Sequence, residues 1–585
     1  MFLPITKAEI DKAGWDYVDV IIVSGDAYID HPSFGTAVIA RTLEADGLRV
    51  AVLPQPNWRD DLRDFRKLGK PRLFFGVTSG SMDSMVNHYT AAKRLRSDDA
   101  YTPNNEAGFR PDYATTVYSQ ILKRIYPETP VIIGGIEASM RRLAHYDYWS
   151  DSLMPSILLE SKADILVYGM GEKIITEIAR KLNVGEPIET IRYNLKQIAY
   201  ITYQDIKLPD AIHLPSFEEC KKAKRKQAES IAIIERNANK YEGSVLIQNY
   251  GPVNVVVNAP DNEFSQTDLD KSFDLPYEYE PHPKYAKRGK IPAFEMIKHS
   301  INIHRGCFGG CVFCTIAAHQ GKKIISRSEK SILAEIEKVA KRKDFKGYLT
   351  DLGGPSANMY LMGGKNKKLC EKCVKPSCIY PSLCANLNNN HQPLLSLYAK
   401  VRSLPYIKKV FIGSGIRYDL MTDYKYLDEI FLYHVSGRLK VAPEHSSSEV
   451  LSLMRKPSFD RFIELKKHFD LLNKRYKMKQ QLIPYFISSH PGCTLRDMAK
   501  LAADTAKLGY HLEQVQDFTP TPMTIATEMY YTGYDPLTMR KVFCATTKEE
   551  KQEQNRIFFW YKKENIHWAK AIFKRFGMKC NTPPF

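Results

Sequence analysis

Three cysteines in a glycine-rich loop constrain this chain more than any other feature. The loop, residues 301–314, reads INIHRGCFGGCVFC and places Cys307, Cys311 and Cys314 at the spacing C-x3-C-x2-C. This spacing differs from the paired C-x2-C of zinc fingers and from the four-cysteine run of ferredoxins. A [4Fe–4S] cluster held by three thiolates keeps one iron open for a substrate or cofactor. We therefore predict an iron–sulfur cluster at this loop.

The residues between the cysteines support this interpretation. Phe313, just before the third cysteine, is expected to shield the site. Zinc is the main alternative and would need a fourth ligand nearby, for which His304 and His319 are the nearest candidates. Three glycines allow backbone conformations that other residues resist, so that the sulfurs can approach one cluster: Gly306, Gly309 and Gly310.

The loop, a C-x3-C-x-aromatic-C sequence, resembles the signature of the radical S-adenosylmethionine (SAM) superfamily. The resemblance implies an enzyme in which SAM binds the open iron and the reduced cluster passes an electron to the sulfonium. It further implies release of a 5'-deoxyadenosyl radical, exclusion of water from the site, and an electron donor such as flavodoxin or ferredoxin. The substrate is not implied.

Length and charge set outer limits. At 585 residues the chain is too long for one core, so two or three domains are expected. No apolar run approaches the ~20 residues of a membrane span, and the N-terminus lacks the features of a signal peptide, so a cytoplasmic protein is expected. The formal net charge of +18 permits nucleic-acid binding. The basic runs are scattered, however, and we favour solvated faces.

The first 184 residues alternate strand and helix signals, as in a doubly wound α/β sheet. A helix is predicted over 35–45, and strands over 17–23, 48–53, 72–77, 130–133 and 164–168. Glycines stand where strands meet helices, at the edge where such sheets bind ligands. The arrangement resembles the flavodoxin-like, cobalamin-binding domain that precedes the radical barrel in many SAM enzymes.

A histidine after the first strand bears on cobalamin. Base-off cobalamin proteins offer a histidine to cobalt from a D-x-H-x-x-G loop, whereas here Asp30 adjoins His31 and Gly35 follows four residues later. The broken pattern argues against His31 as a cobalt ligand and favours a loop histidine. Cobalamin binding is therefore doubtful, and an empty or repurposed domain is at least as well supported as a cobalamin site.

The rest of the chain is predicted to hold the reactive core. Residues 185–292 are expected to connect, with a helix over 217–238 and an extended linker over 275–283. Residues 293–565 are predicted as a partial (β/α)6 TIM-type barrel and 566–585 as a tail, with an amphipathic helix at 556–575. Six strands ending in polar or glycine-rich turns are expected at 301–303, 347–352, 410–412, 438–441, 482–487 and 515–518.

By analogy with the superfamily, SAM is expected at the ends of these strands. Gly353 and Gly354 resemble the glycine pair whose backbone receives the SAM amino group. Glu444 and Ser446 lie where related barrels contact the ribose, and Ser488 begins the turn that flanks the adenine.

A second cysteine cluster lies in a Lys- and Asn-rich insertion at 365–391. Cys370, Cys373, Cys378 and Cys384 form C-x2-C-x4-C-x5-C, which can close a zinc site or a second iron–sulfur cluster. Both alternatives stay open, because a structural metal would order this polar loop and an auxiliary cluster would supply electrons or bind substrate. The other four cysteines are expected to be plain thiols: Cys220, Cys493, Cys544 and Cys580.

Longer strings give a closer resemblance. Residues 81–90, 134–149, 352–360 and 441–445 are similar to the YgiQ-type radical SAM proteins, over nearly the whole chain. This implies the architecture but no substrate. Within 134–149, Glu137, Arg141 and Arg142 would suit an anionic or planar substrate, but we favour a helix surface with salt bridges.

Two other functions are alternatives to a radical enzyme of unknown substrate. The turns at 444–445 and 490–493 resemble those of methylthiotransferases, which would make this an RNA- or protein-modifying radical enzyme. The sequence shows no separate RNA-binding domain after the barrel, which weakens this reading. A non-catalytic metal-binding scaffold is the third possibility, and the three-cysteine loop argues against it because a scaffold needs no open iron.

Overall fold

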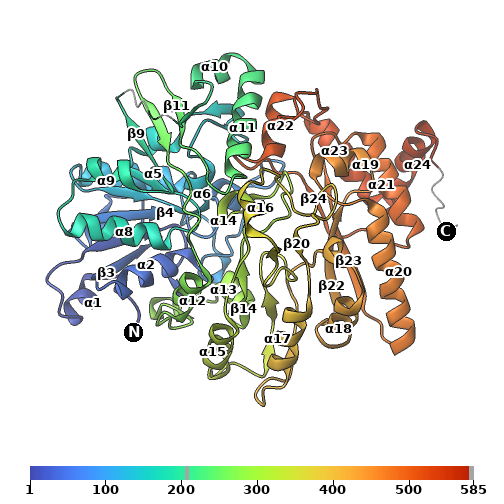
Figure 1. Cartoon of the computed structure of the whole chain (residues 1–585), viewed down its shortest axis with the longest axis horizontal. Helices are drawn as coiled ribbons and strands as arrows, with labels where there is room; N and C mark the ends of the chain where they lie inside the picture. The colour runs from blue at the N-terminus through green and yellow to red at the C-terminus, as the bar shows by residue number, and fades with distance from the viewer. Residues whose placement is uncertain (205–207, 209, 579–585) are drawn as a thin grey trace.

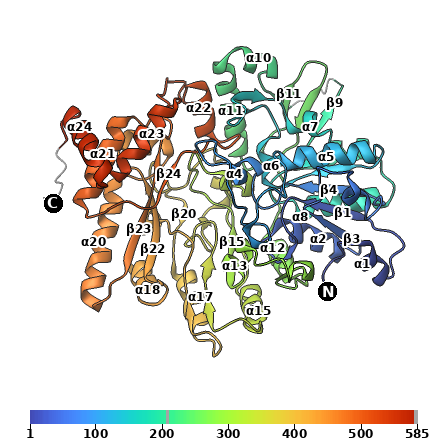
Figure 2. The same ribbon diagram turned by 180° about the vertical axis from the view of Figure 1, so that it is seen from behind.

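The computed structural model describes residues 1–204, 208 and 210–578, so Cys580 and the end of the predicted tail lie outside the described residues. The chain has a mixed α/β fold. Seen from the front and from behind, a nine-stranded sheet in the N-terminal half and a three-stranded parallel sheet near the C-terminus lie at opposite ends of the molecule (Figures 1 and 2). Helix α14 (Thr315–Gln320) lies between them (Figure 1).

Five parallel strands form the centre of the N-terminal sheet. Their order is β3-β1-β4-β5-β8, and every neighbouring pair is parallel. The order in which strands are added to the sheet therefore reverses between β1 and β4, as in one common doubly wound order. All five overlap predicted strands: β1 (Val20–Ser24), β3 (Val50–Pro54), β4 (Phe74–Thr78), β5 (Val131–Ile133) and β8 (Ile165–Val167).

Helices cover both faces of these strands. Val20 and Ile22 of β1 pack in one apolar core with α2 and α8, whereas Ile21 and Val23 pack in a second core with α5 and α7. Successive side chains of a strand point to opposite faces, so a strand covered on both sides needs a continuous apolar run. The helices are α2 (Gly35–Ala45), α5 (Ala114–Ile125), α7 (Ile157–Ser161) and α8 (Glu172–Asn183).

The sheet continues past residue 184 into the region predicted to be a connection. Its added strands are β9 (Ile198–Thr202), β10 (Ile212–His213), β11 (Leu246–Asn249) and β12 (Asn254–Val257). β9 runs antiparallel to both β8 and β12. The predicted helix over 217–238 is two helices, α10 (Phe217–Lys222) and α11 (Lys224–Ala238), because Ala223 has an extended backbone with φ −137° and ψ 108°.

The predicted linker is extended but firmly attached to the N-terminal half. It follows α12 (Gln266–Asp274), and β13 (Glu280–Pro281) pairs antiparallel with β2 (Ile29–Asp30). The backbone N–H of Tyr279 donates to the Asp30 carbonyl at 2.8 Å, and the Asp30 carboxylate forms a buried ion pair with Arg41 of α2. The linker therefore adds buried contacts to the first sheet.

The C-terminal half contains strands at all six predicted barrel positions. They are β14 (Ser300–Asn302), β17 (Tyr348–Leu349), β18 (Asp351–Gly353), β21 (Lys409–Val410), β22 (Arg438–Glu444), β23 (Gln481–Ser488) and β24 (Val515–Asp517). Parallel pairing joins β14 to β18, β17 to β21, and β22 to β23 and then β24. A parallel bridge from Ile416 to Val441 links the chain after β21 to β22.

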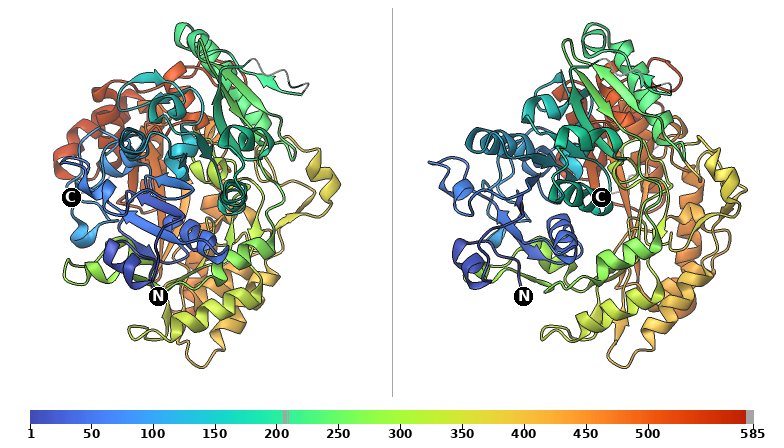
Figure 3. Two further views of the ribbon diagram at one scale, coloured as in Figure 1. Left: turned by 90° about the vertical axis from the view of Figure 1, so that its left-hand side faces the viewer. Right: turned by 60° about the vertical axis from the view of Figure 1, so that its left-hand side comes forward.

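Helices of this half, drawn yellow to orange, lie on its outer side (Figure 3). They include α15 (Glu329–Ala340), which begins after the N-cap residue Ser328, α17 (Gln392–Arg402) and α20 (Phe459–Tyr476). The single amphipathic helix predicted at 556–575 is interrupted between α23 (Lys548–Arg556) and α24 (Ile566–Arg575). In the described ranges, no helix is both long and apolar enough to cross a membrane.

Candidate functional site

Two glycines shape the cysteine loop because no side chain would fit. Gly306 has φ +85°, and a Cβ there would lie 2.1 Å from the Lys323 carbonyl oxygen. Gly310 has φ +65°, and its Cβ would lie 2.4 Å from the Pro376 carbonyl oxygen. Both positions combine a left-handed backbone with a close backbone neighbour, which only glycine tolerates.

Distant parts of the chain hold this loop in place. Ser377 of the cysteine-rich insertion donates from Oγ to the Gly309 carbonyl at 2.8 Å. Arg455 donates to the Gly310 carbonyl at 3.2 Å and makes a two-pronged ion pair with Glu235 of α11 at 2.6 and 2.8 Å. The loop is thus fixed both by the insertion and by the N-terminal half.

The three loop cysteines are half-buried and lie close enough for their charges to interact. The pKa of Cys314 is raised to about 12, mainly by burial and also by the neighbouring Cys311 and Cys307. Burial likewise raises the pKa of Cys307. Close thiolates of like charge need a cationic acceptor, so the donor set fits an iron–sulfur cluster.

The loop does not form a ready-made site for a single ion. Across residues 1–204, 208 and 210–578, no three His, Cys, Asp or Glu side chains are grouped closely enough to hold one metal ion. A cubane cluster does not require this convergence, because each of its thiolates binds a different iron.

Arg417 contacts the loop, although the sequence showed it only in a turn after a predicted strand. Its Nη1 donates to Cys311 Sγ at 3.3 Å. Asp419 orients the guanidinium by accepting from Nε at 2.9 Å and from Nη2 at 2.6 Å, and Asn358 Oδ1 accepts from the Arg417 backbone N–H at 2.8 Å. A guanidinium beside a cysteine favours the thiolate, which is the form that binds metal.

The predicted glycine pair lies next to the loop, at the end of β18. The Gly353 carbonyl accepts from the Ile303 N–H at 2.8 Å. A Cβ on Gly354 would lie 2.5 Å from His304 Nε2, so the close approach of this imidazole requires glycine. Burial lowers the pKa of His304 to about 4, and its Nε2 lies 2.9 Å from the Ser356 carbonyl oxygen.

Three other predicted SAM contacts lie at or just after the ends of β22 and β23. Glu444 has a left-handed backbone with φ +66°; burial raises its pKa, and Lys456 Nζ lies 3.6 Å away. Within the described part of the chain, the buried Ser446 Oγ has no hydrogen-bond partner. Ser488 donates to the Asp517 carboxylate at the end of β24. Polar groups therefore gather at the carboxyl ends of parallel strands, where barrel enzymes place their sites.

Phe313, the predicted shield, points toward the turn after β23. Its ring meets the His490 ring edge-on, with centroids 5.8 Å apart. His490 itself is fully buried, and burial lowers its pKa to about 4, so its imidazole is neutral near pH 7. The third cysteine is therefore preceded by an aromatic contact between the loop and the strand ends.

Two of the four cysteines of the insertion, Cys378 and Cys384, pack in one apolar cluster with Phe308 and Cys307 of the first loop. The Cys378 N–H donates to the Phe308 carbonyl at 3.1 Å, and the Cys384 N–H donates to the Cys378 carbonyl at 2.9 Å. Burial raises the pKa of Cys378 to about 11, and the nearby Cys370, Cys373 and Cys384 thiolates add to the rise. This second group of sulfurs has the donor chemistry of a zinc or iron–sulfur site.

A cavity of about 400 Å³ lies at the edge of the N-terminal sheet that was predicted to bind ligands. Ends of the parallel strands and the start of α8 form one wall, and Asn302, Arg305 and His319 of the other half form the opposite wall. Arg305 and Glu172 make an ion pair between the two halves. The predicted edge is therefore hollowed and covered by the region of the cysteine loop.

His31 is not among the described residues that line this cavity. It is 1% exposed, and its Nδ1 accepts from the Ser33 N–H at 3.1 Å. Burial lowers its pKa to about 3, and Tyr279 packs edge-on against its ring with centroids 5.1 Å apart. The expectation of a packed loop histidine fits these contacts.

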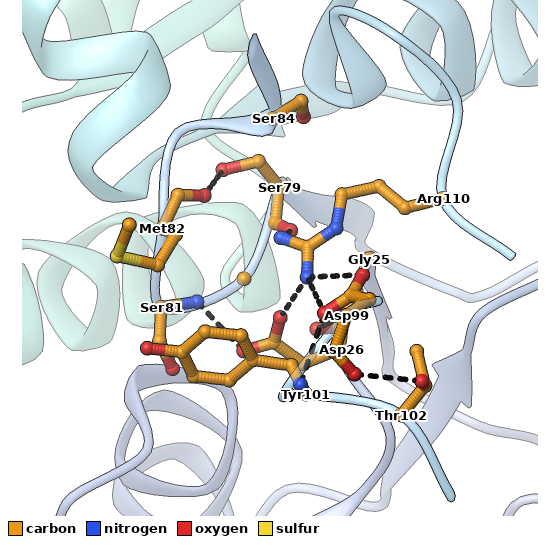
Figure 4. Close-up of polar contacts among 12 residues, drawn as sticks. Gly25, Asp26, Ser79, Ser81, Met82, Ser84, Asp99, Tyr101, Thr102 and Arg110 are labelled. Carbon is orange, nitrogen blue, oxygen red and sulfur yellow. Dashed lines mark hydrogen bonds and ion pairs between the residues drawn. The ribbon is translucent and has the colours of Figure 1, made fainter. Parts of the chain in front are cut away.

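The buried guanidinium of Arg110 holds the loop that follows β4, which lines this cavity with Gly80 and Ser81 (Figure 4). Arg110 Nη2 lies 2.9 Å from Asp26 Oδ1 and 3.3 Å from Asp99 Oδ2, and Nη1 donates to the Ser79 carbonyl at 2.8 Å. Asp26 Oδ2 accepts from the Ser81 N–H at 2.7 Å. Sequence reasoning missed this network, since its members are spread over 85 positions without a spacing that marks a site.

The charged group at 137–149 separates into two environments. Arg141 pairs with Asp83 and lies 3.8 Å from Asp147, and Glu137 accepts from the Ser84 N–H at 2.8 Å. These residues form salt bridges, as the favoured alternative expected, but they are buried and do not lie on a helix surface. Arg142, the next residue, has no carboxylate within 4.0 Å in the described structure.

Comparisons with known proteins identify the family. The model of the "Radical SAM N-terminal" family matches residues 2–300, and that of a domain of unknown function, DUF3362, matches residues 513–577. A UPF0313 protein of Porphyromonas gingivalis is 56% identical over 98% of this chain and 93% of its own length. Another from Bacteroides thetaiotaomicron is 58% identical, covering 96% and 94%. This chain belongs to the UPF0313 family.

A third relative, the UPF0313 protein of Methanocella arvoryzae, is 47% identical over 97% of this chain and 94% of its own length. Among solved structures, the radical SAM methyltransferase TsrM of Kitasatospora setae with tryptophan and aza-SAM covers 86% of this chain and 75% of its own, at 16% identity and a TM-score of 0.47. TsrM with cobalamin and a [4Fe–4S] cluster covers 87% and 77%, at 16% identity and a TM-score of 0.48.

Proposed function

We propose that this UPF0313 protein is a radical SAM enzyme in which Cys307, Cys311 and Cys314 hold a [4Fe–4S] cluster. When bound, the cluster would supply the electron for reductive cleavage of SAM to a 5'-deoxyadenosyl radical. The observation that carries the proposal is a half-buried loop of three neighbouring thiols, supported by glycines that no other residue could replace. Arg417 Nη1 donates a hydrogen bond to Cys311 Sγ, one of the three sulfurs that would bind the cluster.

The strand ends beside the loop would bind and orient SAM. Backbone groups at Gly353 and Gly354 would receive its amino group, while Glu444 and Ser446 would contact the ribose and Ser488 the adenine side. The nearness of the glycine pair to His304 supports the first assignment, and the free hydroxyl of Ser446 within the described residues supports the second. Buried walls would exclude water from the reacting atoms.

The insertion would hold a second metal through Cys370, Cys373, Cys378 and Cys384, as zinc or as an auxiliary iron–sulfur cluster. Its contact with Phe308 supports a role beside the first loop. We further infer a YgiQ-type, cytoplasmic enzyme with a flavodoxin-like N-terminal domain and a partial barrel, reduced by a flavodoxin or ferredoxin. Its substrate is not assigned.

Anaerobic reconstitution tests the proposal. Iron, sulfide, zinc and cobalt are measured together with 5'-deoxyadenosine formed from SAM under dithionite, in the wild type, Cys311→Ala and the control Cys544→Ala. Cys544 lies apart from the loop and donates to the Met529 carbonyl. We expect the wild type and the control to retain iron and cleave SAM, and Cys311→Ala to do neither.

The metal ratios and the substrate dependence separate the alternatives. Four irons per chain with zinc would assign zinc to the insertion, whereas about eight irons would assign a second cluster, and cobalt would show cobalamin. A fully loaded wild type that never cleaves SAM would contradict radical chemistry and favour a metal-binding scaffold. RNA that copurifies in a strongly salt-dependent manner would favour an RNA-modifying enzyme.

A further inference from the structure

A second cavity, of about 490 Å³, separates the N-terminal sheet from the cysteine-rich insertion. Tyr168–Met170 after β8, the end of α11, α14 and the insertion form its walls. Figure 1 shows α11, α14 and α16 (Lys367–Glu371) around this central region. The cavity also reaches Phe308, the neighbour of Cys307.

The charged side chains on these walls are mostly cationic. Two carboxylates line the cavity, and one of them, Asp261, is paired with Lys173 at 3.0 Å, while the other, Glu371, is exposed. Within the described ranges, none of the lining cations has a carboxylate within 4.0 Å. These cations are Arg142, Lys240, Lys322, Lys323 and Lys367. Among its Arg, Lys, Asp and Glu side chains the cavity therefore carries an excess of positive charge, and Cys370, Cys378 and Cys384 of the insertion line it as well.

Arg142 is the buried member of this group and is 8% exposed. Its Nη1 donates to the Ser139 carbonyl at 2.6 Å, and its guanidinium lies 4.9 Å from the centre of the Tyr168 ring. Its Nε has no hydrogen-bond partner in the part of the chain that the structure describes. Burial of a guanidinium without a counter-ion is costly, and here it lowers the pKa of Arg142. An oxyanion would offset this cost with charge-assisted hydrogen bonds.

The remaining walls suit an apolar body attached to such an oxyanion. Phe308, Phe264, Met170 and Met362 all line the cavity. His319 also lines the cavity, and burial lowers its pKa to about 4, so its imidazole is neutral near pH 7. Its buried Nδ1 has no hydrogen-bond partner within the described structure.

We propose that this cavity binds an organic anion, with a carboxylate or phosphate on Arg142 and Lys323 and an apolar body against Phe308 and the two methionines. The site is distinct from the predicted SAM contacts and does not depend on radical chemistry. In this proposal two neighbours in sequence have different roles. Arg141 stabilises the fold through its ion pair with Asp83, whereas Arg142 binds the ligand.

Equilibrium dialysis of the full-length, anaerobically purified protein tests the site with three probes of similar size. Naphthyl phosphate and naphthoate carry the two oxyanions, and naphthalenemethanol is the neutral control. We expect an anionic probe to bind more tightly than the neutral one, and Arg142→Gln and Lys323→Gln to weaken that binding roughly 10- to 100-fold. The control Arg180→Gln removes an exposed guanidinium that is paired with Asp46 and should bind as the wild type does.

Several results would overturn the proposal. They are equal binding of the neutral probe, no binding of either anion at millimolar concentration, and undiminished binding by a folded Arg142→Gln. If Arg142→Gln does not fold, Lys323→Gln decides: weaker anion binding supports the site, and unchanged binding refutes it. Because binding is measured without SAM cleavage, failure here is distinguishable from failure of the proposed function.

Discussion

Glu528 is a buried carboxyl group whose replacement should make the protein more stable in a pH-dependent manner. It lies in α22 (Ile525–Thr532), 0% exposed, and its Oε2 accepts from Gln227 Nε2 of α11 at 3.1 Å. Within the described residues its Oε1 has no hydrogen-bond partner. Burial raises its pKa from 4.5 to about 7. Glu528→Gln keeps the shape and the acceptor but cannot ionise.

The direction in which stability changes with pH depends on whether the folded or the unfolded protein holds the proton of Glu528. Between pH 4.5 and about 7 the folded protein keeps a proton that the unfolded chain has released, so stability falls as pH rises and levels off above pH 7. At 1.36 kcal/mol per pH unit, the cost is about 2 kcal/mol at pH 6 and about 3 kcal/mol at pH 8. Glu528→Gln avoids this cost, so its free energy of unfolding should exceed that of the wild type by about 2 kcal/mol at pH 6 and about 3 kcal/mol at pH 8.

Chemical unfolding followed by tryptophan fluorescence at pH 6 and pH 8 provides the measurement. Glu549→Gln is the matched control, because Glu549 is exposed on α23 and its replacement should change stability little at either pH. The advantage of Glu528→Gln should grow by about 1 kcal/mol between the two pH values. An advantage that does not change with pH, or a variant less stable than wild type at pH 8, would refute the assignment of a buried, protonated Glu528.

Three further substitutions test the site. Gly310→Ala should lower both the iron content and the melting temperature, because its Cβ would lie 2.4 Å from a backbone carbonyl oxygen. Gly363→Ala is the control, because a Cβ at Gly363 would meet no atom within 4 Å. Equal effects of the two substitutions on iron content and melting temperature would contradict this account. Arg417→Gln should shift the reduction potential of the reconstituted cluster to more negative values, because a cation beside a loop sulfur is lost; an unchanged potential in EPR-monitored titration would count against that contact. Arg110→Met should destabilise the N-terminal half by about 3–5 kcal/mol, because two buried carboxylates lose their counter-ion; a loss below about 1 kcal/mol in thermal unfolding would be incompatible with the network in Figure 4.

Local sequence was sufficient for features that depend on neighbouring residues. The five parallel strands were predictable because a strand covered on both faces must be apolar at consecutive positions. The cysteine loop was predictable because its spacing and glycines set the backbone path, which the left-handed conformations of Gly306 and Gly310 confirm.

Only the tertiary structure decided features that depend on distant partners. Strands β9 to β12 come from a polar region whose pattern predicted a connection, and they form because the edge of an existing sheet supplies hydrogen-bond partners. Arg417 meets Cys311 across 106 positions of sequence. Arg141 and Arg142 are chemically identical neighbours, yet one pairs with Asp83 and the other faces a cavity. Residue type sets which interactions a side chain can make, but packing sets which partners are within reach and how much water is excluded.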